Sequence, residues 1–343
     1  MSYLRLVGQR LVMMVLTLWG LATLVFIMIK LIPGDEAQVA AGAGATAEQV
    51  AQVTKRLGLD QPIPLQYLNF LGRLLRGDLG TSVVSSKPVL TELAAVLPST
   101  LELMVFASIL GVLLAFPAAL VAATFRGKVV DGVSRLVAVM GGAMPTFWLA
   151  LMLQYFLGSV LRITPITGQH SFGVSAPSIT GMPTVDALLA GNLSAFFDAL
   201  AYLILPAFVF AVPFASQVYR ILRATLLGVL ASDLVLPVLA KGASTRRIVL
   251  RHALPNSLAP TVSLIGTLVG GMVGGAILIE TVFARRGVGG YLANSVALKD
   301  TYAVLGAVMF VGVTVCVVNL VADIATLMLD PRVRGTQFRS GAK

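Results

Sequence analysis

The sequence predicts an all-α integral membrane protein with six transmembrane helices. Of its 343 residues, 57% are apolar and 12% are charged, whereas soluble domains carry about 25% charged residues. Several apolar stretches run for about 20 residues, which is enough for a helix to cross a hydrocarbon core of about 30 Å. The charged residues gather at the ends of these stretches, so lipid is the expected solvent.

Six apolar stretches are the candidate spans. They cover residues 11–32, 97–123, 136–160, 200–221, 259–282 and 303–329. A helix suits lipid because it closes its backbone hydrogen bonds within the segment. The first stretch follows Arg5 and Arg10, as a signal peptide would. We prefer a span, because the apolar region has about 22 residues and signal peptides have about 7–15.

The distribution of basic residues predicts the orientation. With the N-terminus inside, most of the 25 Lys and Arg residues fall in cytoplasmic segments, namely Arg5, Arg10, Arg126, Lys128, Arg135, Arg220, Arg223, Lys241, Arg246, Arg247, Arg251, Arg332, Arg334, Arg339 and Lys343. The outer segments hold most of the acidic residues and are close to neutral. The positive-inside rule therefore places both termini in the cytoplasm, which an even number of spans requires.

The expected organisation is one transmembrane domain over residues 1–335, followed by a cytoplasmic tail at 336–343. Its long connections are two outer segments and one cytoplasmic segment, at about 33–96, 161–199 and 222–258.

The two outer segments differ in composition. Residues 46–57 have an amphipathic pattern opened by Thr46, which predicts a short helix with Thr46 as its N-cap. Residues 161–199 are rich in Gly, Ser, Thr and Pro, which predicts an irregular loop.

The cytoplasmic segment predicts an elbow of two short helices. Asp233 is suited to begin the first helix, and Gly242 to end it in the left-handed conformation. Ser244 is suited to cap a second helix over residues 245–254. Two interpretations of its arginines stay open. They face water or anionic head groups, or the elbow is a docking element for a cytoplasmic partner.

The spacing in this elbow resembles a known family. Leu254 and Pro255 follow Gly242 after 12 and 13 positions, as in the "EAA" loop of ABC importer permeases. Residues 240–244 and 250–256 are similar to the dipeptide, oligopeptide and nickel branch of that family. Further matching stretches lie in the family's order at 57–62, 76–80, 98–103, 145–149, 280–283 and 330–334. The resemblance covers roughly residues 4–334.

The resemblance implies a type I ABC importer permease fold in the cytoplasmic membrane of a bacterium or archaeon. In that family the loop forms coupling helices that lie in a groove of a cytoplasmic ATPase. The coupling residues that it implies here are Asp233, Ala240, Lys241, Gly242, Ala243, Ser244, Arg247, Arg251, His252, Leu254 and Pro255.

The family also implies partners and a division of labour. This chain is expected to be a non-catalytic subunit that binds no cofactor, because it lacks the phosphate-binding G-x-x-x-x-G-K-[ST] loop. ATP and Mg²⁺ are expected in two partner ATPase subunits. The other expected partners are a second, similar permease in a heterodimer, an external solute-binding protein and membrane lipid. Nucleic acid is not expected, because no basic block with interleaved aromatic residues occurs. Peptides are the first expected substrate, and nickel or a related small solute the second.

Two stretches depart from the family pattern. Leu236, Pro237 and Val238 stand where the EAA triad aligns, and Pro237 predicts a late helix start or a kink. Arg285 and Arg286 replace a more apolar stretch at the predicted outer face. We expect these two arginines to form a solvated surface. The alternative is that they contact a binding protein or an anionic ligand group.

Polar and small residues within the spans are candidates for the transport pathway, since ionisable residues in lipid are costly. Glu102 and Glu280 lie near the predicted outer interface and are candidate gate residues. Gly270 and Gly274 belong to a glycine-rich stretch of the fifth span; close helix packing is the default interpretation and a moving gate is the alternative. For Asn319 and Asp323 on the sixth span, packing against neighbouring helices is preferred to a place on the pathway.

Two other functional classes were weighed. An ion-coupled secondary transporter that needs no ATPase would show ionisable residues at the midplane and broken helices in two matching halves. Pro117, Pro206 and Pro213 interrupt predicted spans, but no paired repeat is visible. An intramembrane enzyme would need a nucleophile and a base at membrane depth. Both histidines, His170 and His252, lie outside the spans.

Overall fold

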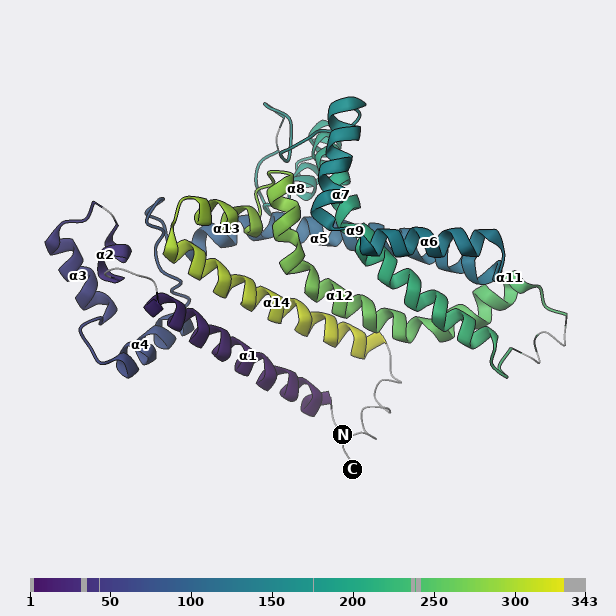
Figure 1. The fold of residues 1–343 in the computed structure, drawn as a ribbon, viewed down its shortest axis with the longest axis horizontal. Helices are drawn as coiled ribbons and strands as arrows, with labels where there is room; N and C mark the ends of the chain where they lie inside the picture. Colours follow the sequence, from purple (N-terminus) through teal and green to yellow (C-terminus); the bar gives the residue numbers. More distant parts are fainter. Residues whose placement is uncertain are drawn as a thin grey trace. The chain divides into compact units, whose positions relative to one another are not determined.

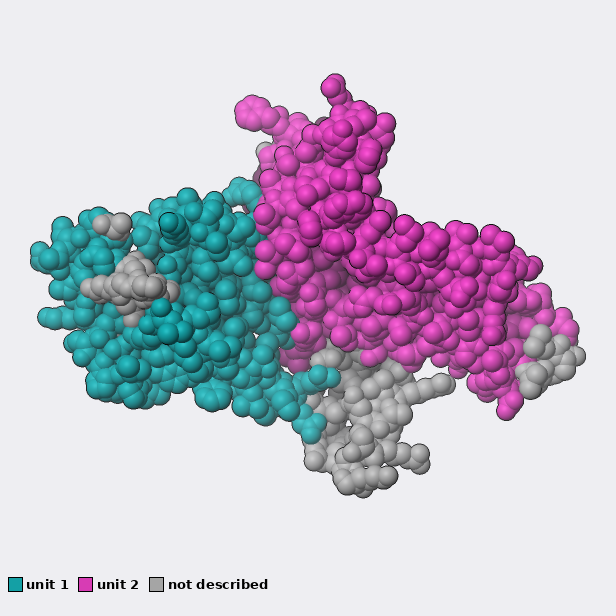
Figure 2. Space-filling model, viewed as in Figure 1, with its two compact units in different colours: residues 1–100, 286–317 teal, residues 101–285, 318–343 magenta. Residues whose placement is uncertain are grey.

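The fold was analysed in a computed structural model, which describes residues 3–31, 36–42, 44–174, 176–235, 238 and 242–329. This part of the chain forms helices, turns and an isolated β-bridge between Thr81 and Pro88 (Figure 1). The chain divides into two compact units, shown in Figure 2. Unit 1 contains residues 1–100 and 286–317, and unit 2 contains residues 101–285 and 318–343. The single domain over residues 1–335 stays a prediction.

Unit 1 combines the N-terminal span with the first long predicted outer segment. Its elements are α1 (Tyr3–Leu31), α2 (Glu36–Ala41), α3 (Ala47–Leu57), α4 (Ile63–Leu75), α13 (Val288–Ala297) and the first parts of α5 (Val89–Thr124) and α14 (Thr301–Leu329). The predicted amphipathic helix is confirmed as α3. Thr46 and Gln49 form a capping box at its start, and Gly58 ends it in the left-handed conformation.

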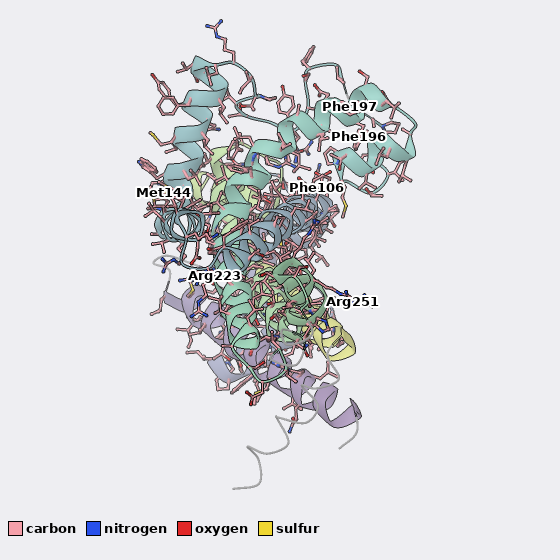
Figure 3. The ribbon with its side chains drawn as sticks, turned by 90° about the vertical axis from the view of Figure 1, so that its right-hand side faces the viewer. Phe106, Met144, Phe196, Phe197, Arg223 and Arg251 are labelled. Atoms are coloured by element: carbon pink, nitrogen blue, oxygen red, sulfur yellow. The ribbon has the colours of Figure 1, made fainter. Side chains whose placement is uncertain are left out.

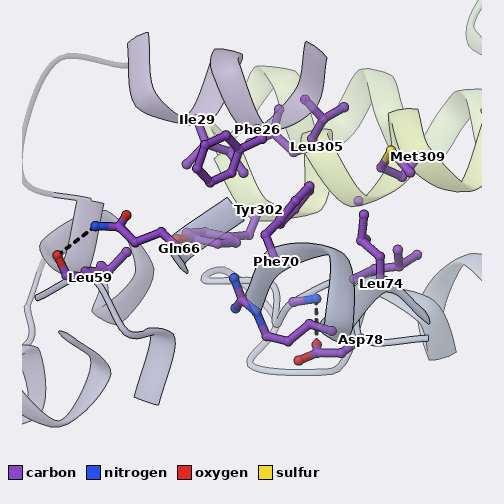
Figure 4. Close-up of a pocket in the computed structure, with 15 residues that line it drawn as sticks. Phe26, Ile29, Leu59, Gln66, Phe70, Leu74, Asp78, Tyr302, Leu305 and Met309 are labelled. Carbon is purple, nitrogen blue, oxygen red and sulfur yellow. Dashed lines mark hydrogen bonds between the residues drawn. The ribbon is translucent and has the colours of Figure 1, made fainter. Parts of the chain in front are cut away.

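The core of unit 1 lies where α1, α4 and α14 meet. The Phe26 ring is 5.2 Å from Tyr67 and 5.6 Å from Phe70, measured between centroids. Leu305 and Met309 of α14 pack against the same cluster. A pocket of about 40 Å³ remains between these elements (Figure 4). This volume holds a few water molecules and is too small for an organic ligand.

Unit 2 holds the remaining spans and the predicted cytoplasmic elbow. Its elements are the rest of α5 and α14 together with α6 (Val129–Ala143), α7 (Thr146–Leu153), the π-helix η1 (Gln154–Val160), α8 (Pro183–Leu189), α9 (Leu193–Leu230), α11 (Thr245–Ile248), the π-helix η2 (Val249–Ala253) and α12 (Leu254–Val282). The helix α9 packs along both α6 and α12 (Figure 1). It is therefore the central helix of this unit.

Five helices of the described chain are long and apolar enough to span a membrane. They are Gly8–Leu31, Val89–Thr124, Leu193–Leu230, Thr245–Val282 and Thr301–Ala322. Several extend beyond the apolar stretches, because a helix continues past the hydrocarbon where its backbone bonds still close.

The remaining predicted span, residues 136–160, is not a continuous helix. It consists of two segments, Val129–Ala143 and Thr146–Val160, which meet at 102°. Met144 lies at the corner with φ −68° and ψ 131° (Figure 3). Pro145 explains the bend, since it excludes the residue before it from helical geometry and has no N–H to donate. Six spans are therefore present only if this bent pair counts as one.

Three other prolines do not interrupt their helices. Pro117 lies within α5, and Pro206 and Pro213 lie within α9. The expected interruptions are wrong, because neighbouring helices and local adjustments satisfy the backbone groups that a proline leaves free in a packed membrane helix.

Candidate functional site

The predicted elbow begins where α9 ends at Leu230. Residues 231–235 form a turn in which Asp233 is exposed and Val235 is buried. Pro237, Ala240 and Lys241 of the predicted first coupling helix lie outside the described residues. The kink of that helix therefore stays a prediction.

The turn into the second helix has the predicted geometry. Gly242 has φ +74°, in the left-handed region. Ser244 is the N-cap residue of α11 in an extended conformation, but its side chain makes no capping hydrogen bond. The helix begins at Thr245, as expected.

The second helix does not end at residue 254. The segments α11, η2 and α12 follow one another without a break, so Thr245–Val282 is a single helix of 38 residues. The expectation of a separate short helix before a span at 259–282 is wrong. Pro255 lies in the first turn of α12, and the π-helical turn before it lets the N–H of Leu254 reach the carbonyl of Val249. Such a wider turn accommodates the proline ring without a break.

This helix start presents a basic face. The side chains of Arg246, Arg247 and Arg251 are exposed (Figure 3 labels Arg251). On the other side, Ile248 and Val249 are buried, and η2 packs against α9. The arginines therefore stand on an anchored helix.

An ion pair joins α9 to α6 close to the elbow. Arg223 donates from Nε to Asp131 Oδ1 at 2.7 Å and from Nη2 to Oδ2 at 2.8 Å. The N–H of Gly127 donates to the same carboxylate at 3.1 Å, and Asp131 is buried. The hydroxyls of Ser134 and Tyr219 lie 2.8 Å apart beside it. The pairing of Asp131 with Arg223 was not predicted, although Asp131 is a lone acidic residue among the basic residues 126, 128 and 135.

A second charged cluster gathers at the other end of α12. Arg285 Nη2 lies 3.2 Å from Glu102 Oε2, and both side chains are 1% exposed. Glu102 Oε1 accepts from the N–H of Thr184 at 2.8 Å and from its hydroxyl at 2.6 Å. Glu280 is also buried, and its carbonyl accepts from the N–H of Arg285 at 2.8 Å. The candidate gate residues Glu102 and Glu280 thus face one arginine.

The expectation that Arg285 forms part of a solvated surface is wrong. Arg285 is 3% exposed, because a buried carboxylate lies within its reach, whereas Arg286 next to it is exposed as expected. Burial lowers the pKa of the Arg285 guanidinium, and the carboxylates of Glu102 and Glu280 oppose that shift. An arginine stays protonated even so. Arg285 therefore carries its positive charge within this buried cluster.

The predicted irregular loop over 161–199 contains a helix and is attached to the end of α12. Gln154 Nε2 donates to the carbonyls of Ile166 at 2.7 Å and Val282 at 3.1 Å. The N–H of Gly168 donates to the carbonyl of Phe283 at 2.9 Å. The loop prediction is wrong for residues 183–189, which form α8, and from Leu193, where α9 begins.

One carboxylate closes the turn before α8. Asp186 accepts from the N–H and hydroxyl of Thr180 at 2.6 and 2.7 Å, and from the N–H of Gly181 at 3.1 Å. Burial raises the pKa of the Asp186 carboxyl, but these hydrogen bonds outweigh burial and hold the pKa below its usual value. A polar turn is thereby fixed in a segment whose composition indicated only a loop.

The two candidate glycines of α12 have different surroundings. A Cβ on Gly270 would lie 1.5 Å from Oδ1 of Asn319, so the Asn319 side chain of α14 lies against the backbone of α12 there. A Cβ on Gly274 would meet nothing within 4 Å. Packing is thus confirmed for Asn319, while the side chain of Asp323 lies outside the described residues. A gate role for either glycine stays a prediction.

An apolar groove of about 400 Å³ lies between α5, α6 and α9. Its lining includes Ala115, Ala138 and Val212, and Tyr219 borders it. Among the residues that the structure describes, no group of three or more His, Cys, Asp or Glu side chains is placed to hold a metal ion.

Comparison with known proteins places the chain in a family. Residues 111–335 match the family described as binding-protein-dependent transport system inner membrane component, and residues 3–104 match the N-terminal family of the same membrane components. The chain is 37% identical to the probable D,D-dipeptide transport system permease protein DdpB of Escherichia coli over 334 residues, which is 97% of this chain and 98% of the relative.

Two further relatives cover the chain equally well. The dipeptide transport system permease protein DppB of Alkalihalophilus pseudofirmus is 32% identical, over 95% of this chain and 98% of its own length. The glutathione transport system permease protein GsiC of Salmonella typhi is also 32% identical, over 96% and 99%. The chain therefore belongs to the family of inner membrane components of binding-protein-dependent transport systems, as a multi-pass ABC importer permease of the dipeptide type.

Proposed function

We propose that this chain forms half of the translocation pathway of an ATP-driven peptide importer. Both termini face the cytoplasm, and the segment from Asp233 to Pro255 receives mechanical work from a partner ATPase. The observation that carries the proposal is the continuity of the helix Thr245–Val282. Its exposed basic start and its buried charged end belong to one rigid element.

The length of this helix makes it suitable for transmitting motion. Its 38 residues span about 57 Å at 1.5 Å per residue, which exceeds the thickness of the bilayer. A force on the exposed face of Arg247 and Arg251 acts on the same helix that ends beside Glu280. Because a packed helix moves as a unit, displacement at the start is passed to the far end.

The coupling contact involves both sides of the elbow. Its residues are Asp233, Ala240, Lys241, Gly242, Ala243, Ser244, Arg247, Arg251, His252, Leu254 and Pro255. Arginines on an anchored helix favour an acidic groove on the partner. Gly242 sets the direction of the second helix through its left-handed conformation.

The remaining parts of the machine are other chains. Two ATPase subunits bind ATP and Mg²⁺, a second and similar permease completes the pathway as a heterodimer, and a solute-binding protein delivers the substrate from outside. Short peptides are the proposed substrate, because the relatives are named as dipeptide and glutathione permeases. Glu102, Gly270, Gly274 and Glu280 are the proposed gate and pathway residues.

The test is a reconstituted importer with a break at Gly242. The chain is co-expressed with the ATPase, permease and binding-protein genes beside it, and ATP-dependent uptake of a labelled dipeptide into proteoliposomes is measured. Gly242→Pro is expected to abolish uptake, because proline is fixed near φ −65° and the site has φ +74°. Ni²⁺ and a panel of sugars test the substrate class.

Gly173→Pro is the matched control. Gly173 has φ +76°, and a Cβ there meets nothing within 4 Å, as at Gly242. It lies in the predicted outer segment, so uptake is expected to persist. Uptake that survives Gly242→Pro would contradict the coupling role, and uptake without any ATPase subunit would favour the ion-coupled alternative.

A further inference from the structure

The buried guanidinium of Arg285 is incompletely satisfied. Its Nη2 meets Glu102 at 3.2 Å, which is long for a charge-assisted hydrogen bond. Its Nε and Nη1 are buried without a hydrogen-bond partner. A buried cation with unmet donors is costly. A conformation in which Arg285 meets water or a better acceptor would recover that cost.

The arginine also stands at a junction of three segments. Glu102 belongs to α5, Thr184 to the first turn of α8, and Arg285 to the turn after α12. Glu102 binds the other two at the same time, with Oε1 on Thr184 and Oε2 on Arg285. Loss of the contact with Arg285 therefore removes the side-chain link between the end of α12 and α8 that runs through Glu102.

The backbone at this junction is strained. Ala284, directly before Arg285, has φ +48°, in the left-handed region that residues with a Cβ rarely occupy. Such strain persists only where surrounding contacts enforce it. Here the N–H of Arg285 is held by Glu280 and the carbonyl of Phe283 by Gly168. The turn is thus poised to relax when its contacts are released.

We propose that Arg285 is a positioning residue of the outer gate. Its contact with Glu102 locks α8 to the outer end of α12 in the resting importer, and the contact breaks when the loaded binding protein docks. ATP hydrolysis then waits for substrate, because α12 also carries the coupling segment at its other end. This inference rests on the proposed function and on the orientation proposed with it.

The experiment measures ATP hydrolysis by the complete reconstituted importer, with and without loaded binding protein. Arg285→Gln and Glu102→Gln are each expected to raise the rate without binding protein by about five- to tenfold, the usual size of a coupling between two sites. The double variant is expected to exceed neither single variant, because both remove one contact. A purely structural role would instead lower the rates with and without binding protein together.

Two further variants make the result specific. Arg286→Gln removes the exposed neighbouring charge and is expected to leave both rates unchanged. Thr184→Val removes one of the two donors from α8 to Glu102 and is expected to raise the unstimulated rate to a smaller extent.

The outcomes separate the two proposals. A wild-type importer that does not respond to binding protein contradicts the proposed function. The proposed role of Arg285 is overturned if the wild type responds to binding protein but the unstimulated rate is unchanged in the three variants Arg285→Gln, Glu102→Gln and Thr184→Val. If the first two variants fail to assemble, an unchanged rate in Thr184→Val overturns it as well.

Discussion

Two ion pairs of unit 2 contain a buried carboxylate, and they are built differently. Asp131 and Arg223 share two bonds of 2.7 and 2.8 Å, and a backbone N–H completes the carboxylate. Glu102 and Arg285 share one contact of 3.2 Å, and two guanidinium donors stay unmet. A satisfied fork holds one arrangement firmly, whereas a half-satisfied pair leaves part of the cost of burial uncompensated. In the proposed orientation, the firm pair braces the cytoplasmic side and the weak pair lies at the outer gate.

The largest expected effect comes from breaking the firm pair. Arg223→Met takes the two-bond partner from the buried carboxylate of Asp131 and leaves only Arg135, 4.0 Å away, which costs about 3 kcal/mol of stability. Thermal unfolding in detergent micelles with added lipid measures this loss. The double variant Asp131→Asn, Arg223→Met is expected to recover part of the lost stability. If Arg223→Met alone were as stable as the wild type, the ion pair would not stabilise this side of the protein.

Arg285→Met is expected to cost less. The same substitution removes a cation here as well, but it also removes two unmet donors, and Glu102 keeps both bonds from Thr184. The net loss is about 1–3 kcal/mol, because the carboxylates of Glu102 and Glu280 lose a buried cation, while the removal of two unmet donors offsets part of that cost. The same unfolding assay applies, and a loss equal to that of Arg223→Met would remove the difference between the pairs.

Substitutions of the glycines in α12 test how tightly this helix is packed between the coupling segment and the charged cluster of Glu102, Glu280 and Arg285. Gly270→Ala is expected to destabilise the protein by about 1–3 kcal/mol, because its Cβ collides with the side chain of Asn319, which must leave its place against α12. Gly274→Ala is the control and is expected to be neutral or slightly stabilising, since a Cβ there meets nothing within 4 Å. Equal losses would show that the helices repack freely.

The smallest expected effect concerns Asp186, the satisfied carboxylate on α8. Its folded-state pKa lies below the usual value, so its contribution is present above the unfolded pKa of about 3.9 and is lost as the pH falls through the folded pKa. Asp186→Asn is expected to lower stability by about 1 kcal/mol at pH 7. The difference from wild type should vanish well below pH 4, and a difference that grows in acid would contradict the sign.

Parts of the fold and of the candidate site followed from local sequence patterns. The helix after Thr46 and the left-handed Gly242 were predictable, because capping and backbone preferences act within a few residues. The bend at Met144 was missed although Pro145 signals it, since three other prolines in spans cause no break. Whether a proline bends a membrane helix depends on its neighbours, which a local pattern does not contain.

The sequence by itself determined the membrane location, the apolar stretches and the family, because hydropathy and motif spacing are written along the chain. Only the tertiary structure decided that Arg285 is buried against Glu102, 183 positions earlier, and that Gly270 admits Asn319. Both depend on side chains that folding brings together from distant segments. The two neighbouring arginines differ for the same reason, since the side chain of Arg285 is buried against a carboxylate and that of Arg286 is exposed.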